Sequence, residues 1–146
     1  MMRIIPYDRA YRDDMIFMVL QAKDALGRKP GLNEDLLSIE DHYIQCGDGF
    51  WLAIDGNDRV VGCIGYSSIP NTTEAFLHRL FVKAEKKHQG IGTKLLYVAE
   101  NAMKKAGKSV SRVHLGSPKE QWFESYAFYE KNGYVEYEPR YMEKKL

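Results

Sequence analysis

The stretch that decides the fold runs Leu77-His-Arg-Leu-Phe-Val-Lys-Ala-Glu-Lys-Lys-His-Gln-Gly-Ile-Gly-Thr-Lys-Leu-Leu96. Its first part has the alternation of a strand, its middle is a basic loop, and Gly90 and Gly92 open a helix predicted to run to about Ala106. A glycine turn between a strand and a helix leaves backbone N–H groups pointing outward at the positive end of the helix dipole. Such a turn suits a phosphate. The basic side chains around it favour the same ligand: Lys83, Lys86, Lys87, His88 and Lys94.

The strand before this turn carries the signature of a β-bulge. Leu80 and Val82 keep the two-residue alternation of a strand, whereas Leu77 and Leu80 lie three residues apart. One extra residue within 78–80 would bring all three side chains to one face. The bulge would also loosen the pairing with a parallel neighbour, predicted at Ser111–Leu115, and the opened edge would suit an extended ligand with amide groups. The alternative is a regular strand in which Leu80 faces the other way.

The whole pattern predicts one α+β domain over residues 1–146. The expected order is β-α-α-β-β-β-α-β-α-β-β, a mixed sheet with helices on both faces, splayed between its fourth and fifth strands. A helical crossover joins those two strands, which makes them parallel. The expected strands cover 3–5, 50–54, 59–68, 74–82, 111–115, 134–138 and 141–145. The expected helices cover 11–26, 34–43, 90–106 and 119–132.

Composition places the chain among ordinary globular proteins. Of its 146 residues, 45% are hydrophobic and 28% are charged, and the net charge of +1 indicates neither nucleic acid nor a membrane surface as a partner. Cys46 and Cys63 lack metal-ligand spacing and the histidines are scattered, so no metal is expected. The absence of a signal peptide and of a spanning segment predicts a cytoplasmic location. A homodimer is left open.

Two motifs resemble those of the GNAT superfamily of acetyl-coenzyme A-dependent N-acetyltransferases. In the first, Lys87, Gly90 and Gly92 occupy the pattern Arg/Gln-x-x-Gly-x-Gly/Ala, after a strand of the pattern Leu-x-x-Leu-x-Val. Lys87 replaces the usual Arg or Gln. The second motif lies within 122–134, where Trp122 replaces an Asn and Tyr134 replaces a Phe. Its matching residues are Phe128, Tyr129, Lys131 and Gly133.

The resemblance implies that an amine attacks the thioester of acetyl-coenzyme A directly. The backbone of Leu80, Phe81 and Val82 would pair with the pantetheine arm, and an N–H of Val82 or Phe81 would polarise the carbonyl. The turn that would hold the pyrophosphate consists of Lys87, His88, Gln89, Gly90, Ile91, Gly92, Thr93 and Lys94.

The resemblance also implies a general acid. Tyr129 would protonate the leaving thiolate, because a tyrosine with an ordinary pKa carries its proton at neutral pH. The alternative for Tyr129 is packing, in an aromatic helix face with Trp122 and Tyr126. His78 or Glu74 is the candidate base, and His78 has the more suitable intrinsic pKa.

The acceptor is predicted to be a primary amine of a small molecule or a peptide. The family builds this site from its N-terminal helices and its last hairpin, which here offer acids and tyrosines: Asp24, Glu34, Asp35, Tyr43, Tyr137 and Tyr141. Two other readings stay open. One is a catalytically weak coenzyme A-binding sensor module on the same fold; the other is an interaction domain, which would leave the glycine turn and its lysines without a role.

Overall fold

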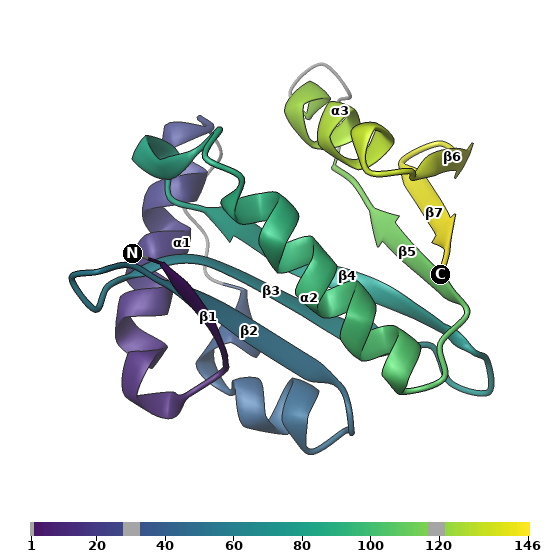
Figure 1. The fold of residues 1–146 in the computed structure, drawn as a ribbon, viewed down its shortest axis with the longest axis horizontal. Coiled ribbons are helices and arrows are strands. Elements are labelled where there is room, and N and C mark those ends of the chain that lie inside the picture. Colours follow the sequence, from purple (N-terminus) through teal and green to yellow (C-terminus); the bar gives the residue numbers. More distant parts are fainter. Residues whose placement is uncertain (1, 28–32, 117–121) are drawn as a thin grey trace.

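A computed structural model describes residues 2–27, 33–116 and 122–146 of the chain. These residues form a seven-stranded mixed sheet with the strand order β1-β2-β3-β4-β5-β7-β6 (Figure 1). The strands are β1 (Arg3–Pro6), β2 (Gly49–Ile54), β3 (Val60–Ser68), β4 (Glu74–Val82), β5 (Val110–His114), β6 (Val135–Glu138) and β7 (Tyr141–Lys145). The α-helices are α1 (Arg12–Ala25), α2 (Ile91–Lys105) and α3 (Phe123–Lys131). Shorter helices are η1 (Arg9–Tyr11), η2 (Glu34–Leu37), η3 (Glu40–Ile44) and η4 (Ala84–Lys86).

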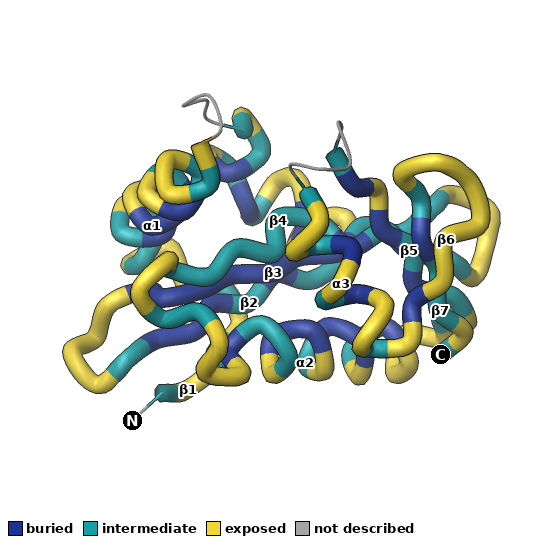
Figure 2. The backbone as a smooth tube through the Cα atoms, turned by 90° about the horizontal axis from the view of Figure 1, so that it is seen from above, coloured by how far each residue is buried: buried dark blue, intermediate teal, exposed yellow. Residues whose placement is uncertain are grey.

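Helices α1 and α2 cover opposite faces of the sheet (Figure 2). Apolar residues at helical spacing form the buried stripe of each helix, as expected for an amphipathic element. The stripe of α2 consists of Ile91, Leu95, Leu96, Ala99 and Met103, and that of α1 of Met15, Met18, Val19 and Ala22. Two hydrophobic clusters result, one between the sheet and helices α2 and α3, the other between the sheet and α1.

The predicted bulge in β4 is confirmed. Cys63 of β3 pairs with Phe81 and Gly65 pairs with His78, so Ile64 alone lies opposite Arg79 and Leu80. The side chains of Leu77, Leu80 and Val82 all join the cluster under α2, as their spacing predicts. The bulge shifts the register between β4 and the antiparallel strand β3, whereas the sequence led us to expect its effect on the pairing with the parallel strand β5.

The predicted splay between β4 and β5 is confirmed as well. The two strands are parallel and pair over three positions, from Glu74 opposite Val110 to Phe76 opposite Arg112. Beyond Phe76 the described residues of β5 pair with β7 and no longer with β4, and Figure 1 shows the two strands diverging. No strand among the described residues therefore pairs with the β5 side of β4 from Leu77 onward.

The prediction of one continuous helix over residues 34–43 is wrong. Residues 34–43 form two short pieces, the 3-10 helix η2 and the π-helix η3, because Ser38 between them has the non-helical angles φ −144° and ψ 64°. The Ser38 hydroxyl contacts His42 Nδ1 at 3.0 Å, a local bond that competes with regular helix formation. Residues 119–121 of the expected last helix lie outside the described residues. Other boundaries shift by one or two residues, and none of the described helices is long and apolar enough to cross a bilayer.

Candidate active site

The turn between β4 and α2 presents a row of unpaired backbone donors. His88 and Gly90 both have left-handed backbone angles, with φ 64° and 81°. The first backbone bond of the helix runs from Lys94 N to Gly90 O at 3.1 Å. Among the described residues no acceptor is present for the N–H groups of residues 88–93. Six consecutive unpaired donors at a helix N-terminus are the kind of backbone arrangement that can bind a pyrophosphate.

The glycines of this turn leave room for a ligand. A Cβ added at Gly90 would meet no atom within 4 Å, and one added at Gly92 would meet Phe128 at 3.4 Å and Val82 at 3.7 Å. Ile91 sends its side chain into the core, so it offers only its backbone to the turn. The side chains of His88, Gln89 and Lys94 are exposed, and Thr93 is half-buried.

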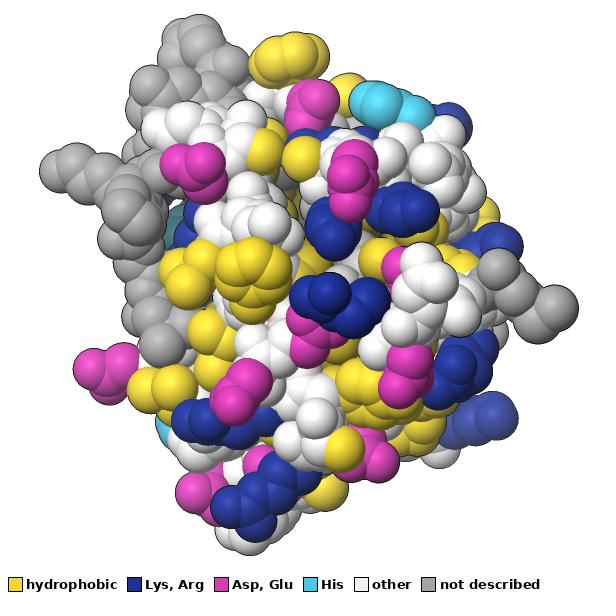
Figure 3. Space-filling view, turned by 90° about the vertical axis from the view of Figure 1, so that its left-hand side faces the viewer, with side chains coloured by type: hydrophobic (Ala, Val, Ile, Leu, Met, Phe, Trp, Pro, Cys, Tyr) yellow, Lys and Arg dark blue, Asp and Glu magenta, His cyan; other side chains and the backbone are white. Residues whose placement is uncertain are grey.

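The lysines of the turn are partly engaged with carboxylates. Lys87 Nζ lies 3.1 Å from Glu124 Oε2 of α3, and Lys83 Nζ lies 3.2 Å from Glu85. Lys86 instead lines a hollow of about 500 Å³ on the side of the β2–β3 hairpin. Basic and acidic side chains are interspersed on the end of the molecule seen in Figure 3. The unpaired backbone donors, rather than a field of free lysines, therefore distinguish this turn.

The open edge of β4 has a defined set of outward groups. Lys83 N donates to Val61 O at 2.8 Å, so Lys83 faces β3, and Phe81, two residues earlier and opposite Cys63, faces β3 as well. The alternation then directs the backbone groups of Leu80 and Val82 away from β3, toward the slot. Of the three residues predicted to contact the pantetheine arm, Leu80 and Val82 therefore direct their backbone groups toward the slot, whereas Phe81 does not.

A clamp that the sequence analysis missed holds the bulge in place. Arg79 has φ 58°, an angle that non-glycine residues rarely adopt. Its guanidinium makes two bonds of 3.0 and 2.9 Å to Asp35 of η2, and Tyr43 Oη donates to the same carboxylate at 2.6 Å. Cys63 Sγ donates to Arg79 O at 3.1 Å. Asp35, expected on the acceptor side, thus serves to fix the strand.

The charges of this clamp are reflected in its pKa values. Burial works to raise the pKa of Asp35, but the bonds from Arg79 and Tyr43 outweigh it and hold that pKa below its ordinary value. Burial raises the pKa of Cys63 to about 12, so its thiol stays protonated and acts as a donor. The Asp35–Arg79 pair is therefore ionised at neutral pH.

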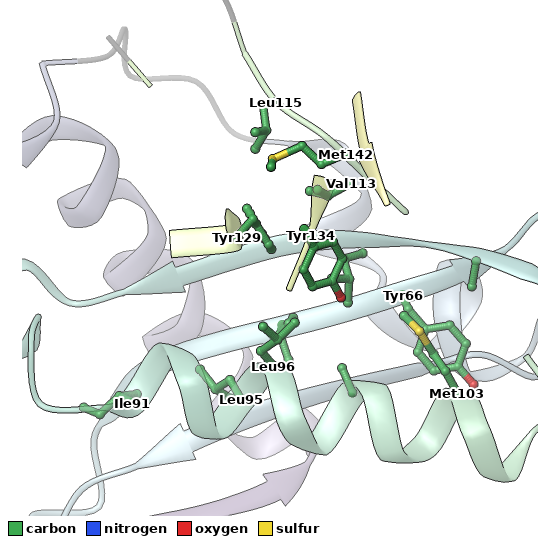
Figure 4. Packing of buried hydrophobic residues seen from close by; sticks show 14 of the residues in the cluster. Tyr66, Ile91, Leu95, Leu96, Met103, Val113, Leu115, Tyr129, Tyr134 and Met142 are labelled. Carbon is green, nitrogen blue, oxygen red and sulfur yellow. The ribbon is translucent and has the colours of Figure 1, made fainter. Parts of the chain in front are cut away.

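Tyr129 lies deep in the cluster between α2 and the sheet. Its side chain is 5% exposed, and its ring meets Phe128 and Tyr134 edge-on, each with 5.2 Å between ring centroids. Figure 4 shows Tyr129 beside Tyr134, above Leu96. Burial, and then the charge of Glu100, raise the pKa of Tyr129, so it is protonated at neutral pH. No described residue bonds to its hydroxyl, which keeps that proton available for donation.

The second unforeseen feature is a buried polar network around Tyr134. The Tyr134 hydroxyl lies 2.8 Å from Ser111 Oγ and 2.8 Å from Glu100 Oε2. Glu100 is 4% exposed and pairs with Lys144 Nζ at 3.2 Å. One sequence signal for this network is Tyr134 itself, which stands where the resembling family has a Phe.

The two candidate bases share a face of β4 but differ in surroundings. Glu74 lies in the paired part of the strand, and its Oε1 accepts from Arg112 Nε at 2.7 Å. His78 lies two residues beyond the last position at which β4 pairs with β5, and its Nε2 contacts Ser67 Oγ at 2.8 Å. Burial, and then the charge of Arg79, lower the pKa of His78, so its imidazole is neutral at pH 7. Position and charge state both favour His78 over Glu74.

The residues expected on the acceptor side are partly brought together. Tyr137 and Tyr141 of the last hairpin lie 6.0 Å apart between ring centroids, and Tyr43 reaches His78 at 6.4 Å. Asp24, near the end of α1, and Glu34 are exposed. The tyrosines of the last hairpin therefore lie together, and Tyr43 lies beside His78 of β4.

Comparisons with known proteins agree with this geometry. Residues 46–136 match the model of a family described as "Acetyltransferase (GNAT) domain". A search of curated proteins finds no matching sequence.

Solved structures match the chain over its full length. A GNAT-family acetyltransferase from Staphylococcus aureus MU50 is 26% identical, covers 100% of this chain and 99% of its own, and has a TM-score of 0.90. An acetyltransferase from Streptococcus agalactiae 2603 is 18% identical, with coverages of 99% and 98% and a TM-score of 0.87. The PaiA N-acetyltransferase from Thermoplasma acidophilum, solved with coenzyme A, is 23% identical, with coverages of 100% and 99% and a TM-score of 0.77.

Proposed function

The chain belongs to the GNAT acetyltransferase family, and on that premise we propose that it moves an acetyl group from acetyl-coenzyme A directly to a primary amine of a small molecule or peptide. The observation that carries the proposal is the open edge of β4 directly before six unpaired N–H groups. The similar protein from Thermoplasma acidophilum, solved with coenzyme A, supports the same ligand. We expect the reaction to take place within a single domain and in the cytoplasm.

The reaction requires the protein to bind the cofactor, to stabilise the developing oxyanion and to transfer protons. Acetyl-coenzyme A supplies a thioester; the amine nitrogen bonds to its carbonyl carbon, the carbon–sulfur bond breaks, the thiolate takes up a proton and the amine gives one up. The N–H groups of residues 88–93 would hold the pyrophosphate. Since Leu80 and Val82 direct their backbone groups toward the slot, we propose Val82 rather than Phe81 as the donor that stabilises the developing oxyanion.

Two side chains would handle the protons. Tyr129 is protonated and its hydroxyl has no acceptor among the described residues, which suits a general acid for the leaving thiolate. His78 is neutral and lies two residues beyond the last position at which β4 pairs with β5, which suits a base that accepts the proton of the amine.

Calorimetry with acetyl-coenzyme A, followed by an assay of thiol release across a panel of amines, tests the proposal. We expect micromolar binding of acetyl-coenzyme A and amine-dependent release of the thiol. Binding without release for every amine would favour a coenzyme A-binding sensor module, and absence of binding would overturn both functions.

A further inference from the structure

A continuous strip of aromatic side chains lies across the mouth of the slot between β4 and β5. It consists of Tyr43, His78, Phe76, Tyr141, His114 and Tyr137, and we call it the aromatic strip. From Tyr43 to Tyr141 each ring lies 6.2 to 6.4 Å from the next between centroids, and His114 and Tyr137 both contact Tyr141, at 4.5 and 6.0 Å. His114 stacks on Tyr141 with 17° between the ring planes. These rings come from η3, β4, β5, β6 and β7, so the strip is a product of the tertiary fold.

The strand register places this strip at the slot itself. Phe76 is the last residue of β4 that pairs with β5, where it lies opposite Arg112. His78 follows two residues later on β4, and His114 follows two residues after Arg112 on β5, so both remain on the face of Phe76. The two histidines therefore stand on the two sides of the opening, with Phe76 at its base.

The strip is on the side of the sheet that α1 and η3 cover over β2 to β4. Its outer part is accessible: Tyr137 is 38% exposed, and Phe76 and Tyr141 are half-buried. Exposed aromatic surface with a polar rim is typical of a ligand-binding groove.

Three carboxylates around the strip, Glu74, Glu143 and Asp35, are paired with arginines. Arg112 bonds to Glu74 at 2.7 Å and to Glu143 at 3.0 Å, and its guanidinium carbon lies 4.6 Å from the centroid of Tyr137. Asp35 is held by Arg79. A ligand with several ammonium groups would have to displace these arginines, at the cost of leaving half-buried charges unpaired.

Two carboxylates near the strip have no cationic partner among the described residues: Asp48 at its inner end, and the exposed Glu138, which lies opposite Tyr141 at its outer end. Asp48 accepts a hydrogen bond from Ser68 Oγ at 2.6 Å, and its charge acts on His78. An uncompensated negative charge beside His78, at the inner end of a row of rings, matches a ligand with an ammonium group at one end of a flat apolar body. The charge of the exposed Glu138 is screened by solvent and contributes less.

Resting on the function proposed above, we propose that the acceptor is a primary monoamine carried by an aromatic body, bound along the aromatic strip with its nitrogen at the mouth of the slot. Aliphatic polyamines and polyhydroxylated amines would then be poor acceptors, because neither has a flat apolar body that can stack on the rings. The additional ammonium groups of a polyamine would also meet carboxylates that are already paired with arginines.

The test compares three amines in the thiol-release assay with the full chain and acetyl-coenzyme A: phenethylamine, n-butylamine and spermidine. We expect kcat/KM for phenethylamine to exceed that for n-butylamine by about tenfold or more, the size of effect that one aromatic contact and the burial of a ring supply. Spermidine should be the weakest of the three. If n-butylamine or spermidine is used as well as phenethylamine, this inference is wrong while the transferase function stands. If acetyl-coenzyme A does not bind and no thiol is released, the proposed function fails and this inference fails with it.

Two variants locate the effect on the strip. Phe76→Leu and Tyr137→Leu keep apolar volume but remove a ring, and each should lower the ratio of phenethylamine to n-butylamine several-fold. Tyr97→Leu, which removes a 50% exposed ring on α2, is the matched control and should leave the ratio unchanged. Should Phe76→Leu fold poorly, Tyr137→Leu decides the question, because Tyr137 is exposed. A ratio equal to that of the unmodified chain in Tyr137→Leu would contradict the assignment.

Discussion

Removing the hydroxyl oxygen of Tyr134 should lower the free energy of unfolding by an amount that can be worked out from its two hydrogen bonds. Tyr134→Phe keeps the ring in the cluster and deletes the bonds to Ser111 and Glu100, both 2.8 Å long. A neutral hydrogen bond contributes about 1 kcal/mol net, and a bond to a charged group about 1.5–3 kcal/mol. We therefore expect the free energy of unfolding to fall by about 2–4 kcal/mol, a large share of the roughly 5–15 kcal/mol typical of a domain.

Urea unfolding with an unchanged m-value measures this loss as a shift of the midpoint. Ser111→Ala removes only the neutral partner and should cost about 1 kcal/mol. Tyr97→Phe makes the same chemical change on an exposed ring, and its free energy of unfolding should stay within about 0.5 kcal/mol of that of the unmodified chain. If Tyr134→Phe destabilises no more than Tyr97→Phe, the buried network does not contribute to stability. The folded variant should still bind acetyl-coenzyme A, because the family carries Phe at this position.

Three further predictions concern the site. Gly92→Glu should abolish binding of acetyl-coenzyme A in calorimetry with circular dichroism unchanged, since a carboxylate would face the proposed pyrophosphate; tight binding in this variant would refute the anion site. Tyr129→Phe should lower kcat by roughly a hundredfold, the lower range for general acid catalysis, with the Kd of acetyl-coenzyme A little changed; unchanged turnover would assign Tyr129 to packing. The folded-state pKa of His78 lies below its ordinary 6.5, so the unfolded chain takes up this proton first as the pH falls, and stability is lost from about pH 6.5 downward until the folded pKa is reached. His78→Gln should flatten the change in the urea midpoint between about pH 7.5 and about pH 5.5; an equal slope in both proteins would contradict it.

Local sequence signals predicted the parts of the site that depend on local backbone. The spacing of Leu77, Leu80 and Val82 sufficed for the bulge, because side-chain alternation follows directly from strand geometry. The paired glycines sufficed for the turn, because Gly90 adopts the left-handed angle that a glycine permits without strain. The family and the fold followed from these two features together with the motif around Tyr129.

Contacts between distant residues could not be predicted in the same way. Asp35 and Arg79 are separated by 44 positions, and nothing in either neighbourhood marks one as the partner of the other. The aromatic strip likewise joins residues of five elements, and its rings meet only once the sheet has formed. The short helices η2 and η3 were missed because Ser38 interrupts a segment whose composition allows one continuous helix.

The clamp on Arg79 holds the backbone of the bulge in its unusual conformation. A left-handed angle at a non-glycine residue costs on the order of 1–3 kcal/mol, so an isolated strand would relax it. The bidentate bond to Asp35, whose side chain is 15% exposed, and the bond from Cys63 to the Arg79 carbonyl hold the angle against that cost. Tyr43 bonds to the same Asp35 and also belongs to the aromatic strip. The contacts that shape the thioester slot are therefore the contacts that position the acceptor side, so the two halves of the proposed reaction share one scaffold.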